Sequence, residues 1–216
     1  MLERATAEQR TSEWFAARCG CLTASRADAV LARRKDGKPT AAYADLIDTL
    51  ICERVTNEPC GIGNPPSVEW GREHEDEARQ AYEDATGELV EQTGFVPHPT
   101  IGFFGASPDG LVGDDGLIEI KCPYSTKIHL ERVAAGVVPE EYRAQMLVQL
   151  LCTGRKWVDF VDYDPRLAGA WKPARLFIVR FEPTQEELAQ TLTQCKEFLD
   201  AVKEKFDDLA RKIIKE

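Results

Sequence analysis

The stretch Ser107-Pro108-Asp109-Gly110-Leu111-Val112-Gly113-Asp114-Asp115-Gly116-Leu117-Ile118-Glu119-Ile120-Lys121 decides the fold. Two apolar pairs flank a Gly/Asp turn signal, a pattern that predicts a β-hairpin. Strand side chains alternate between faces, so Glu119 and Lys121 are expected to share one face. The opposite face carries Ile118, Ile120 and Cys122, which are expected to pack in a core. A hairpin that returns beside Asp109 brings both carboxylates next to the lysine.

Asp109, Glu119 and Lys121 suit the hydrolysis of a phosphodiester. Carboxylate oxygens hold Mg²⁺, or Mn²⁺ in its place, together with waters and substrate phosphate. The ion lowers the pKa of a bound water and neutralises charge on the phosphate. Lys121 can orient or help deprotonate the attacking water and can stabilise the added negative charge. The same residues also occur as an ordinary turn followed by an exposed strand, so the rest of the sequence must decide.

The composition indicates an ordinary globular protein. The chain has 216 residues, of which 43% are hydrophobic and 30% are charged. This length is ample for one domain with a full core, and we expect a single nuclease-type domain over 1–216. No apolar run approaches the roughly 20 residues of a membrane span. Met1-Leu2-Glu3-Arg4 begins no signal peptide, so we expect a cytoplasmic protein with no membrane partner.

The net charge of −10 argues against a protein that simply coats DNA. The charges are nevertheless uneven, with acids concentrated over 69–91 and in the C-terminal helix. A basic stretch near the N-terminus comprises Arg26, Arg33, Arg34, Lys35 and Lys38. A protein that binds DNA in a lined channel can stay acidic outside. The charge balance therefore permits DNA binding without indicating it.

The seven cysteines are scattered, and Cys19-Gly20-Cys21 is the one close pair. No second pair with metal-site spacing accompanies it, which disfavours a zinc or iron–sulfur site. Cys52, Cys122 and Cys152 sit on apolar faces and are expected to be small buried hydrophobes.

Periodicity and turn signals predict the order of elements. Helices are expected over 11–18, 23–33, 43–55, 68–86, 126–135 and 139–152, and from a capping box at 184–187 onward. Besides the hairpin, strands are expected over 89–97, 101–106, 156–163 and 174–181. The apolar stripe of the last helix contains Leu188, Leu192, Cys195, Leu199, Val202, Phe206, Leu209 and Ile213. This order predicts an α/β fold, a mixed sheet flanked by helices on both sides.

Further polar residues have two interpretations each. Glu75 either adds a carboxylate to the metal pair or lies on a solvated acidic helix face. Gln145 and Gln149 share a helix face that meets either solvent or a polar groove. Arg18 with Ser25 at a helix start either binds a phosphate, because free N–H groups and an arginine fork bind anions, or has a purely structural role.

Six short sequence motifs occur in order along the chain and together indicate a family resemblance. They are Arg18-Cys19-Gly20-Cys21-Leu22-Thr23-Ala24-Ser25, Trp70-Gly71-x-x-x-Glu75-x-x-Ala78-Arg79, Ser107-Pro108-Asp109-Gly110-Leu111, Glu119-Ile120-Lys121-Cys122-Pro123, Tyr142-x-x-Gln145 and Tyr163-Asp164-Pro165-Arg166. From about Trp14 to Arg166 the chain resembles the family of the phage lambda exonuclease and the YqaJ-type viral recombinases. The segment 126–141 and the C-terminal helix depart from that family's pattern, which weakens inferences about oligomeric contacts.

The resemblance implies a restriction-endonuclease-like fold with an acid–acid–lysine nuclease site. It implies a processive, Mg²⁺-dependent exonuclease on double-stranded DNA ends that works 5′ to 3′. Such an enzyme releases 5′-mononucleotides and leaves a 3′ single strand for annealing recombination. Asp109, Glu119 and the Ile120 carbonyl would be metal ligands, with Glu75 close to a second metal and Lys121 acting on the nucleophilic water.

The resemblance also implies contacts to the DNA end and to partners. The 5′-phosphate would be held by Arg18, Ser25, Ser107 and Gln145. Val68, in the loop before the catalytic helix, would wedge between terminal base pairs, unless that loop is merely rigid. Lys35 would track the DNA ahead of the site. The family implies a homotrimeric ring threaded by DNA and a single-strand annealing protein as partner.

Two other functions remain open. One is a site-specific or structure-specific endonuclease of the same fold, which needs no pocket for a terminal phosphate. The other is a non-catalytic DNA-end-binding recombination partner, whose binding would not depend on Asp109 or Glu119.

Overall fold

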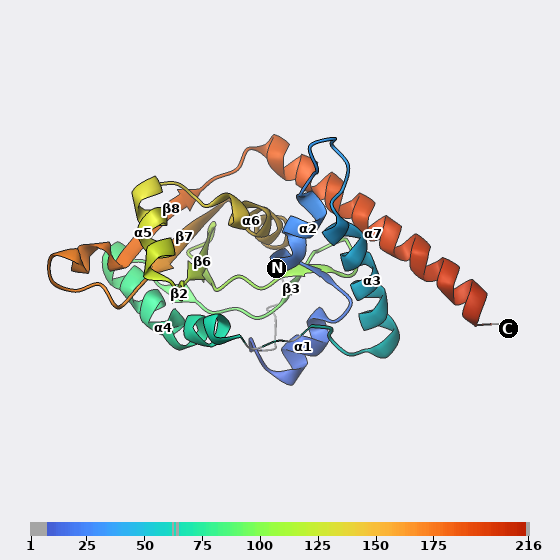
Figure 1. Ribbon diagram of the computed structural model, residues 1–216, viewed down its shortest axis with the longest axis horizontal. Helices are drawn as coiled ribbons and strands as arrows, with labels where there is room; N and C mark the ends of the chain where they lie inside the picture. The colour runs from blue at the N-terminus through green and yellow to red at the C-terminus, as the bar shows by residue number, and fades with distance from the viewer. Residues whose placement is uncertain (1–7, 62, 64, 215–216) are drawn as a thin grey trace.

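The computed structural model describes residues 8–61, 63 and 65–214, so the prediction about Met1–Arg4 lies outside the described residues. The helices are α1 Ser12–Arg18, α2 Ala27–Leu31, α3 Ala41–Thr56, α4 Pro66–Thr86, α5 Thr126–Ala135, α6 Glu140–Thr153 and α7 Gln185–Ile213, with 3-10 turns over Ala24–Arg26 and Gly169–Arg175. The strands are β1 Leu22–Thr23, β2 Val90–Glu91, β3 Val96–Pro97, β4 Phe104–Ala106, β5 Gly110–Val112, β6 Gly116–Lys121, β7 Trp157–Tyr163 and β8 Leu176–Phe181 (Figure 1).

The strands form two sheets with mixed pairing. The larger sheet has the order β2-β5-β6-β7-β8, in which β6 and β7 are parallel and the other pairs are antiparallel. The smaller sheet has the order β1-β4-β3. A parallel pair cannot be joined by a tight turn, and α5 and α6 provide the crossover between β6 and β7. The predicted β5–β6 hairpin is confirmed.

Helices cover both faces of the larger sheet, as the sequence predicts. On one face Ala78 and Tyr82 of α4 pack with alternate residues of β6 and their neighbours, including Ile118, Ile120 and Cys122. On the other face Met146 and Leu150 of α6 pack with Leu117 and Phe160. The period of two therefore directs Glu119 toward α6 and the predicted core residues toward α4.

Several boundaries differ from the sequence prediction. The segment 89–97 forms two short strands, because β2 pairs with β5 while β3 pairs with β4 in the smaller sheet. The helix expected over 23–33 begins as a 3-10 turn and ends at Leu31. Helix α4 begins at Pro66, whose fixed φ suits a first helical position, so Val68 lies in its first turn and not in a loop.

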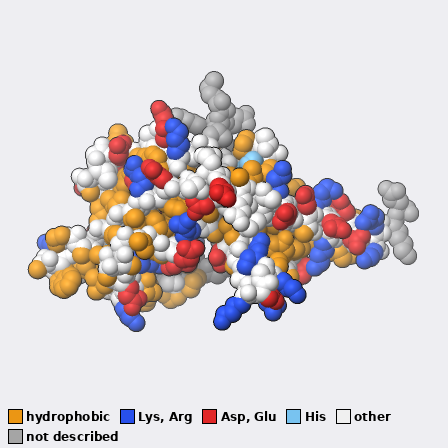
Figure 2. Space-filling view, turned by 90° about the horizontal axis from the view of Figure 1, so that it is seen from above, with side chains coloured by type: hydrophobic (Ala, Val, Ile, Leu, Met, Phe, Trp, Pro, Cys, Tyr) orange, Lys and Arg blue, Asp and Glu red, His pale blue; other side chains and the backbone are white. Residues whose placement is uncertain are grey.

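Two predictions about apolar stripes are wrong. Cys52 is exposed, because the buried side of α3 runs through Leu46, Leu50 and Glu53, and Cys52 points away from it. The stripe of α7 packs against the core as far as Phe206, but Ile213 is 75% exposed. The end of α7 projects beyond the body (Figure 1), and its Lys, Arg, Asp and Glu side chains are interspersed (Figure 2). In the described ranges no helix is both long and apolar enough to cross a membrane.

Candidate active site

The hairpin brings Asp109, Glu119 and Lys121 together, as the sequence predicts. Asp109 lies just before β5, and its Oδ2 accepts a hydrogen bond of 2.7 Å from the backbone N–H of Ile120. Glu119 and Lys121 lie on the same face of β6, and Lys121 Nζ donates to Glu119 Oε1. The side chain of Glu119 is only 1% exposed. An acid pair and an ammonium group thus meet at the C-terminal end of one strand.

Two glutamines of α6 complete the surroundings of Glu119. Gln145 Nε2 donates to Oε1 at 2.6 Å, and Gln149 Nε2 donates to Oε2 at 2.5 Å. The shared face of these glutamines therefore meets a polar pocket and not solvent. Gln145, predicted to hold a terminal phosphate, contacts the carboxylate in this structure. No site role was predicted for Gln149, although its i,i+4 spacing from Gln145 was the available signal.

The electrostatics of this cluster favour a bound cation. Burial raises the pKa of Asp109 well above its usual range, and repulsion from Glu119 and Glu75 adds to the effect. Burial alone would lower the pKa of Lys121, but the attraction of Glu119 and Asp109 outweighs it and raises that pKa. Lys121 is therefore an ammonium group at neutral pH. A further cation beside Asp109 would relieve the repulsion from Glu119 and Glu75 that helps to raise its pKa.

The acid pair fits a divalent cation that keeps part of its water shell. Within the described ranges, no three His, Cys, Asp or Glu side chains converge as a complete metal cage. Mg²⁺ does not require one, since it is commonly held by one or two carboxylates with waters and substrate phosphates. Asp109 and Glu119 provide such a pair.

Glu75 lies on α4, close enough to Asp109 to raise its pKa, so it does not belong to a solvated helix face. Its carboxylate is held by Arg79 at 3.1 Å and by Arg10 from the N-terminal segment. Gln9, the neighbour of Arg10, donates to the backbone carbonyl of Pro108 at 2.8 Å. The N-terminal segment therefore lies against the site, a contact that the sequence did not predict.

A second cluster surrounds Ser107. Arg18 Nη1 donates to Ser107 Oγ at 2.8 Å, and Arg18 Nη2 lies 3.5 Å from Ser25 Oγ. Trp14, one helical turn before Arg18, donates to Ser107 Oγ at 3.0 Å and stacks under the guanidinium at 4.0 Å. Burial and the nearby Arg26 lower the pKa of Arg18 to about 10, which leaves it cationic at neutral pH. Three of the four residues predicted to hold a phosphate thus lie together.

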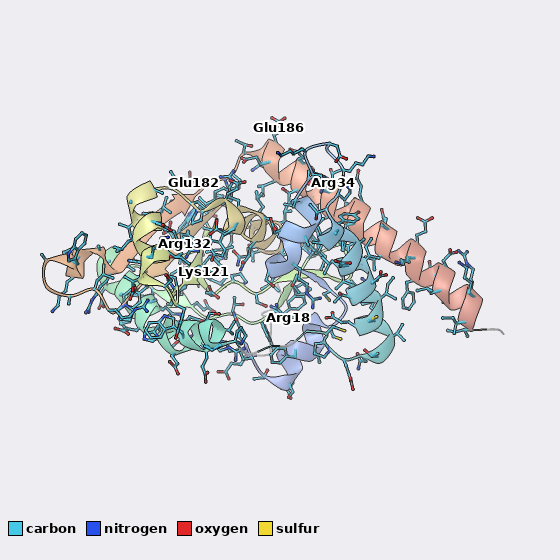
Figure 3. The ribbon with its side chains drawn as sticks, viewed as in Figure 1. Arg18, Arg34, Lys121, Arg132, Glu182 and Glu186 are labelled. Carbon is cyan, nitrogen blue, oxygen red and sulfur yellow. The ribbon has the colours of Figure 1, made fainter. Side chains whose placement is uncertain are left out.

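A cavity of about 800 Å³ joins the two clusters. Its lining includes Arg18, Ser25, Ser107, Glu75, Asp109, Lys121, Gln145 and Val68. Figure 3 shows Lys121 near α5 and Arg18 on α1. Lys35 does not line this cavity, and its neighbour Arg34 lies beside the start of α7, well apart from both clusters (Figure 3).

A buried ionic network supports one wall of the cavity. His129 Nδ1 lies 2.5 Å from Asp162 Oδ1, and Nε2 lies 2.7 Å from the carbonyl oxygen of Ala174. Arg132 donates to the other Asp162 oxygen at 2.6 Å and to the hydroxyl of Tyr142 at 2.8 Å. Because both ring nitrogens of His129 face acceptors, this arrangement favours the doubly protonated, charged ring.

The network makes the stability of the protein depend on pH. Burial alone would lower the pKa of His129, but Asp162 and the Ala174 carbonyl outweigh it and raise that pKa. The charged ring therefore stabilises the fold below the usual histidine pKa of about 6.5, and this contribution is lost as pH rises through the raised value. We expect the melting-temperature advantage of wild type over His129→Gln to shrink from about pH 5.5 to about pH 9.

His98→Gln is the matched control for thermal melts across this pH series. Burial lowers the pKa of His98, so its effect should not shrink with rising pH. A pH-independent difference between wild type and His129→Gln would contradict a charged His129.

Fold and site define the class of the protein as a restriction-endonuclease-like nuclease, with a mixed sheet that presents two acids and a lysine. The chain belongs to the YqaJ-like viral recombinase family, whose family model matches residues 13–156. The resemblance seen in the sequence is thus confirmed.

Solved structures agree with this assignment. The alkaline exonuclease LHK-Exo of Laribacter hongkongensis, solved also in complex with dAMP, is 42% identical, with a TM-score of 0.85. The alignment covers 94% of this chain and 97% of that chain. A phage-related exonuclease from Haemophilus somnus 129PT shares the fold at 16% identity, with a TM-score of 0.62 over 89% of this chain and 96% of that chain. No curated protein matches the sequence.

Proposed function

We propose that this chain is a Mg²⁺-dependent exonuclease that degrades double-stranded DNA from 5′ ends, releases 5′-mononucleotides and leaves a 3′ single strand. One observation carries the proposal. Asp109 and Lys121 of the acid–acid–lysine cluster line the same cavity as Arg18, Ser25 and Ser107. The groups proposed to hydrolyse the phosphodiester would thus lie next to the groups proposed to recognise a phosphorylated end. Family membership supports a nuclease that acts on DNA ends, and the dAMP complex of LHK-Exo supports a mononucleotide product.

The residues present fit one metal site and suggest part of a second. Asp109, Glu119 and the Ile120 carbonyl would hold Mg²⁺, with Mn²⁺ as a possible substitute, and Glu75 would lie close to a second ion. When bound, the metal supplies a water of lowered pKa and neutralises charge that develops on the phosphate.

The protein's own groups would position the reactants. The Arg18 guanidinium, with the hydroxyls of Ser25 and Ser107, would hold the terminal phosphate and set the scissile bond beside Asp109. Lys121 Nζ, an ammonium group beside Glu119, would donate to the attacking water or to a phosphate oxygen. Gln145 and Gln149 fix both oxygens of Glu119 in place, so the carboxylate needs no reorganisation during the reaction.

We further propose one nuclease domain over 1–216 in a homotrimeric ring, with a single-strand annealing protein as partner. A ring that encloses DNA would explain processive digestion by an acidic protein, because topology and not affinity would retain the substrate. Light scattering in solution should then give the mass of three chains. Lys35 and Val68 would contact the DNA in that assembly.

Linear and closed circular DNA distinguish the candidate functions. We expect Mg²⁺-dependent digestion of a blunt linear duplex while the circle stays intact. Cleavage of the circle would favour a site-specific or structure-specific endonuclease. Binding of linear ends without any digestion would favour a non-catalytic recombination partner.

Substitution of Arg18 tests the phosphate cluster. Arg18→Ala removes a charge-assisted hydrogen bond worth about 1.5–3 kcal/mol, so the preference for 5′-phosphorylated over 5′-hydroxyl ends should fall by about tenfold or more. The rate on 5′-hydroxyl ends should change little. Initial rates on the two duplexes give the ratio, with the exposed Arg34→Ala as control. An unchanged ratio would remove Arg18 from end recognition.

A further inference from the structure

The loop between β6 and α5 presents an exposed aromatic ring at the cavity that Asp109 and Lys121 line. Tyr124 follows Lys121 by three residues, is 58% exposed and lines this cavity. Val68 and Ile128, both also exposed, line the cavity as well. Exposed apolar side chains that are grouped at one cavity, unlike ones scattered singly over a surface, mark a binding site.

Hydrogen bonds from Arg166 fix the backbone of this loop. Arg166 donates to the carbonyl oxygen of Tyr124 at 2.9 Å and to that of Pro123 at 3.0 Å. Buried Asp164 holds the same guanidinium through bonds of 2.7 and 2.8 Å. These hydrogen bonds to Arg166 outweigh the effect of burial and lower the pKa of Asp164 to about 2, so the anchor stays charged.

The ring of Tyr124 is also supported by its neighbours. It stands at 85° to the ring of Trp70, with centroids 6.0 Å apart. Trp70 stacks in turn on His74 at 3.8 Å, and Arg166 covers the Trp70 ring at 4.5 Å. The exposed ring is therefore held on a rigid base, and a ligand would lose little of its binding energy in ordering it.

The charges of the cavity indicate what covers the ring. Lys121, Arg18, Arg72 and Arg132 line the same cavity and suit phosphate groups. A ligand that carries phosphates and flat apolar faces matches both features, and a nucleic-acid strand is such a ligand. Stacking on an aromatic ring tolerates any base, because every base has a π face.

We propose that Tyr124 stacks on a DNA base next to the scissile phosphate and so positions the terminal nucleotide. This inference rests on the proposed function and adds a substrate-binding residue to it. The Arg166–Asp164 pair would act through Tyr124 by fixing its backbone.

Paired variants test the proposal with a binding readout and a kinetic one. In an Asp109→Asn background, which is expected to bind without cleaving, a duplex with 2-aminopurine at its 5′ end reports stacking by quenched fluorescence. Adding Tyr124→Ala should abolish the quenching and weaken end binding by about tenfold, within the range for loss of one stacked base. Tyr124→Phe should preserve both. In the active enzyme, Tyr124→Ala should raise KM with a smaller change in kcat.

Trp171→Ala is the matched control, because Trp171 is 65% exposed but does not line this cavity. Equal binding and quenching with and without Tyr124→Ala would overturn the inference. So would a change of oligomeric mass with intact end binding, which would assign Tyr124 to a contact between copies. Failure of the wild-type protein to digest or bind DNA ends would instead overturn the proposed function itself.

Discussion

Asp109→Asn is expected to abolish digestion of DNA while leaving the fold intact. The amide keeps an oxygen that can accept from the Ile120 N–H, so the local hydrogen bond survives. The negative charge that would hold the metal is lost. Metal-assisted charge stabilisation is worth several kcal/mol, and each 1.4 kcal/mol is tenfold in rate, so the initial rate should fall by about a thousandfold or more.

Asp114→Asn is the control for this substitution. Asp114 lies in the exposed turn of the same hairpin, so the variant makes the same change of charge near the site without touching the acid pair. Its rate should match wild type, and both variants should melt near the wild-type temperature. A folded Asp109→Asn protein with more than about a tenth of wild-type activity would contradict the role given to this carboxylate.

Lys121→Met is expected to have the next largest effect. Methionine roughly preserves the length of the side chain and its packing against Tyr142, whose ring centre lies 4.9 Å from the ammonium nitrogen. The substitution removes the donor that would orient water or stabilise the phosphate. Loss of one such preorganised donor costs about a hundredfold to a thousandfold in kcat. Single-turnover digestion with saturating enzyme should show this loss.

Lys156→Met is the matched control, because Lys156 is an exposed lysine that pairs with Asp115 at 2.8 Å beside the start of the neighbouring strand. The Lys121→Met protein should still bind DNA ends. If the affinity of the Lys121→Met protein for DNA ends falls while its single-turnover rate stays normal, Lys121 contributes to binding and not to hydrolysis.

The sequence predicted the centre of the site because the information there is local. The hairpin turn and the strand period fix the relation of Asp109, Glu119 and Lys121 over a short segment. The period of two also placed Ile118 and Ile120 in the core correctly. The family resemblance then joined this hairpin to Arg18, nearly ninety residues earlier.

The remaining features depend on contacts that local patterns do not encode. The short strands β2 and β3 were predicted as one because nothing in 89–97 shows that the chain changes sheets. The prediction that Cys52 is buried was wrong because α3 is apolar on more than one side, and tertiary packing determines which side is buried. The contact of Arg10 with Glu75 comes from a segment without periodicity. The network around His129 joins residues of four separate segments.

The distribution of charged side chains reconciles the acidic chain with the proposed DNA substrate. The net charge is −10, yet Lys121, Arg18 and Arg132 converge on the proposed substrate cavity. Elsewhere, lysines and arginines pair with acids along helices, as Lys203 does with Asp207 at 2.6 Å. We infer that unspecific attraction to DNA is weak on the outer surface and that recognition is confined to the cavity.

One measurement tests the central claim most directly. A duplex labelled separately on each strand, with a 5′-phosphate on one end only, is digested with Mg²⁺ and with a chelator in excess. The account predicts that the phosphorylated strand is released from its 5′ end as single nucleotides, that its complement persists, and that the chelator stops the reaction. Release from the 3′ end, or digestion that continues without free divalent metal, would contradict it.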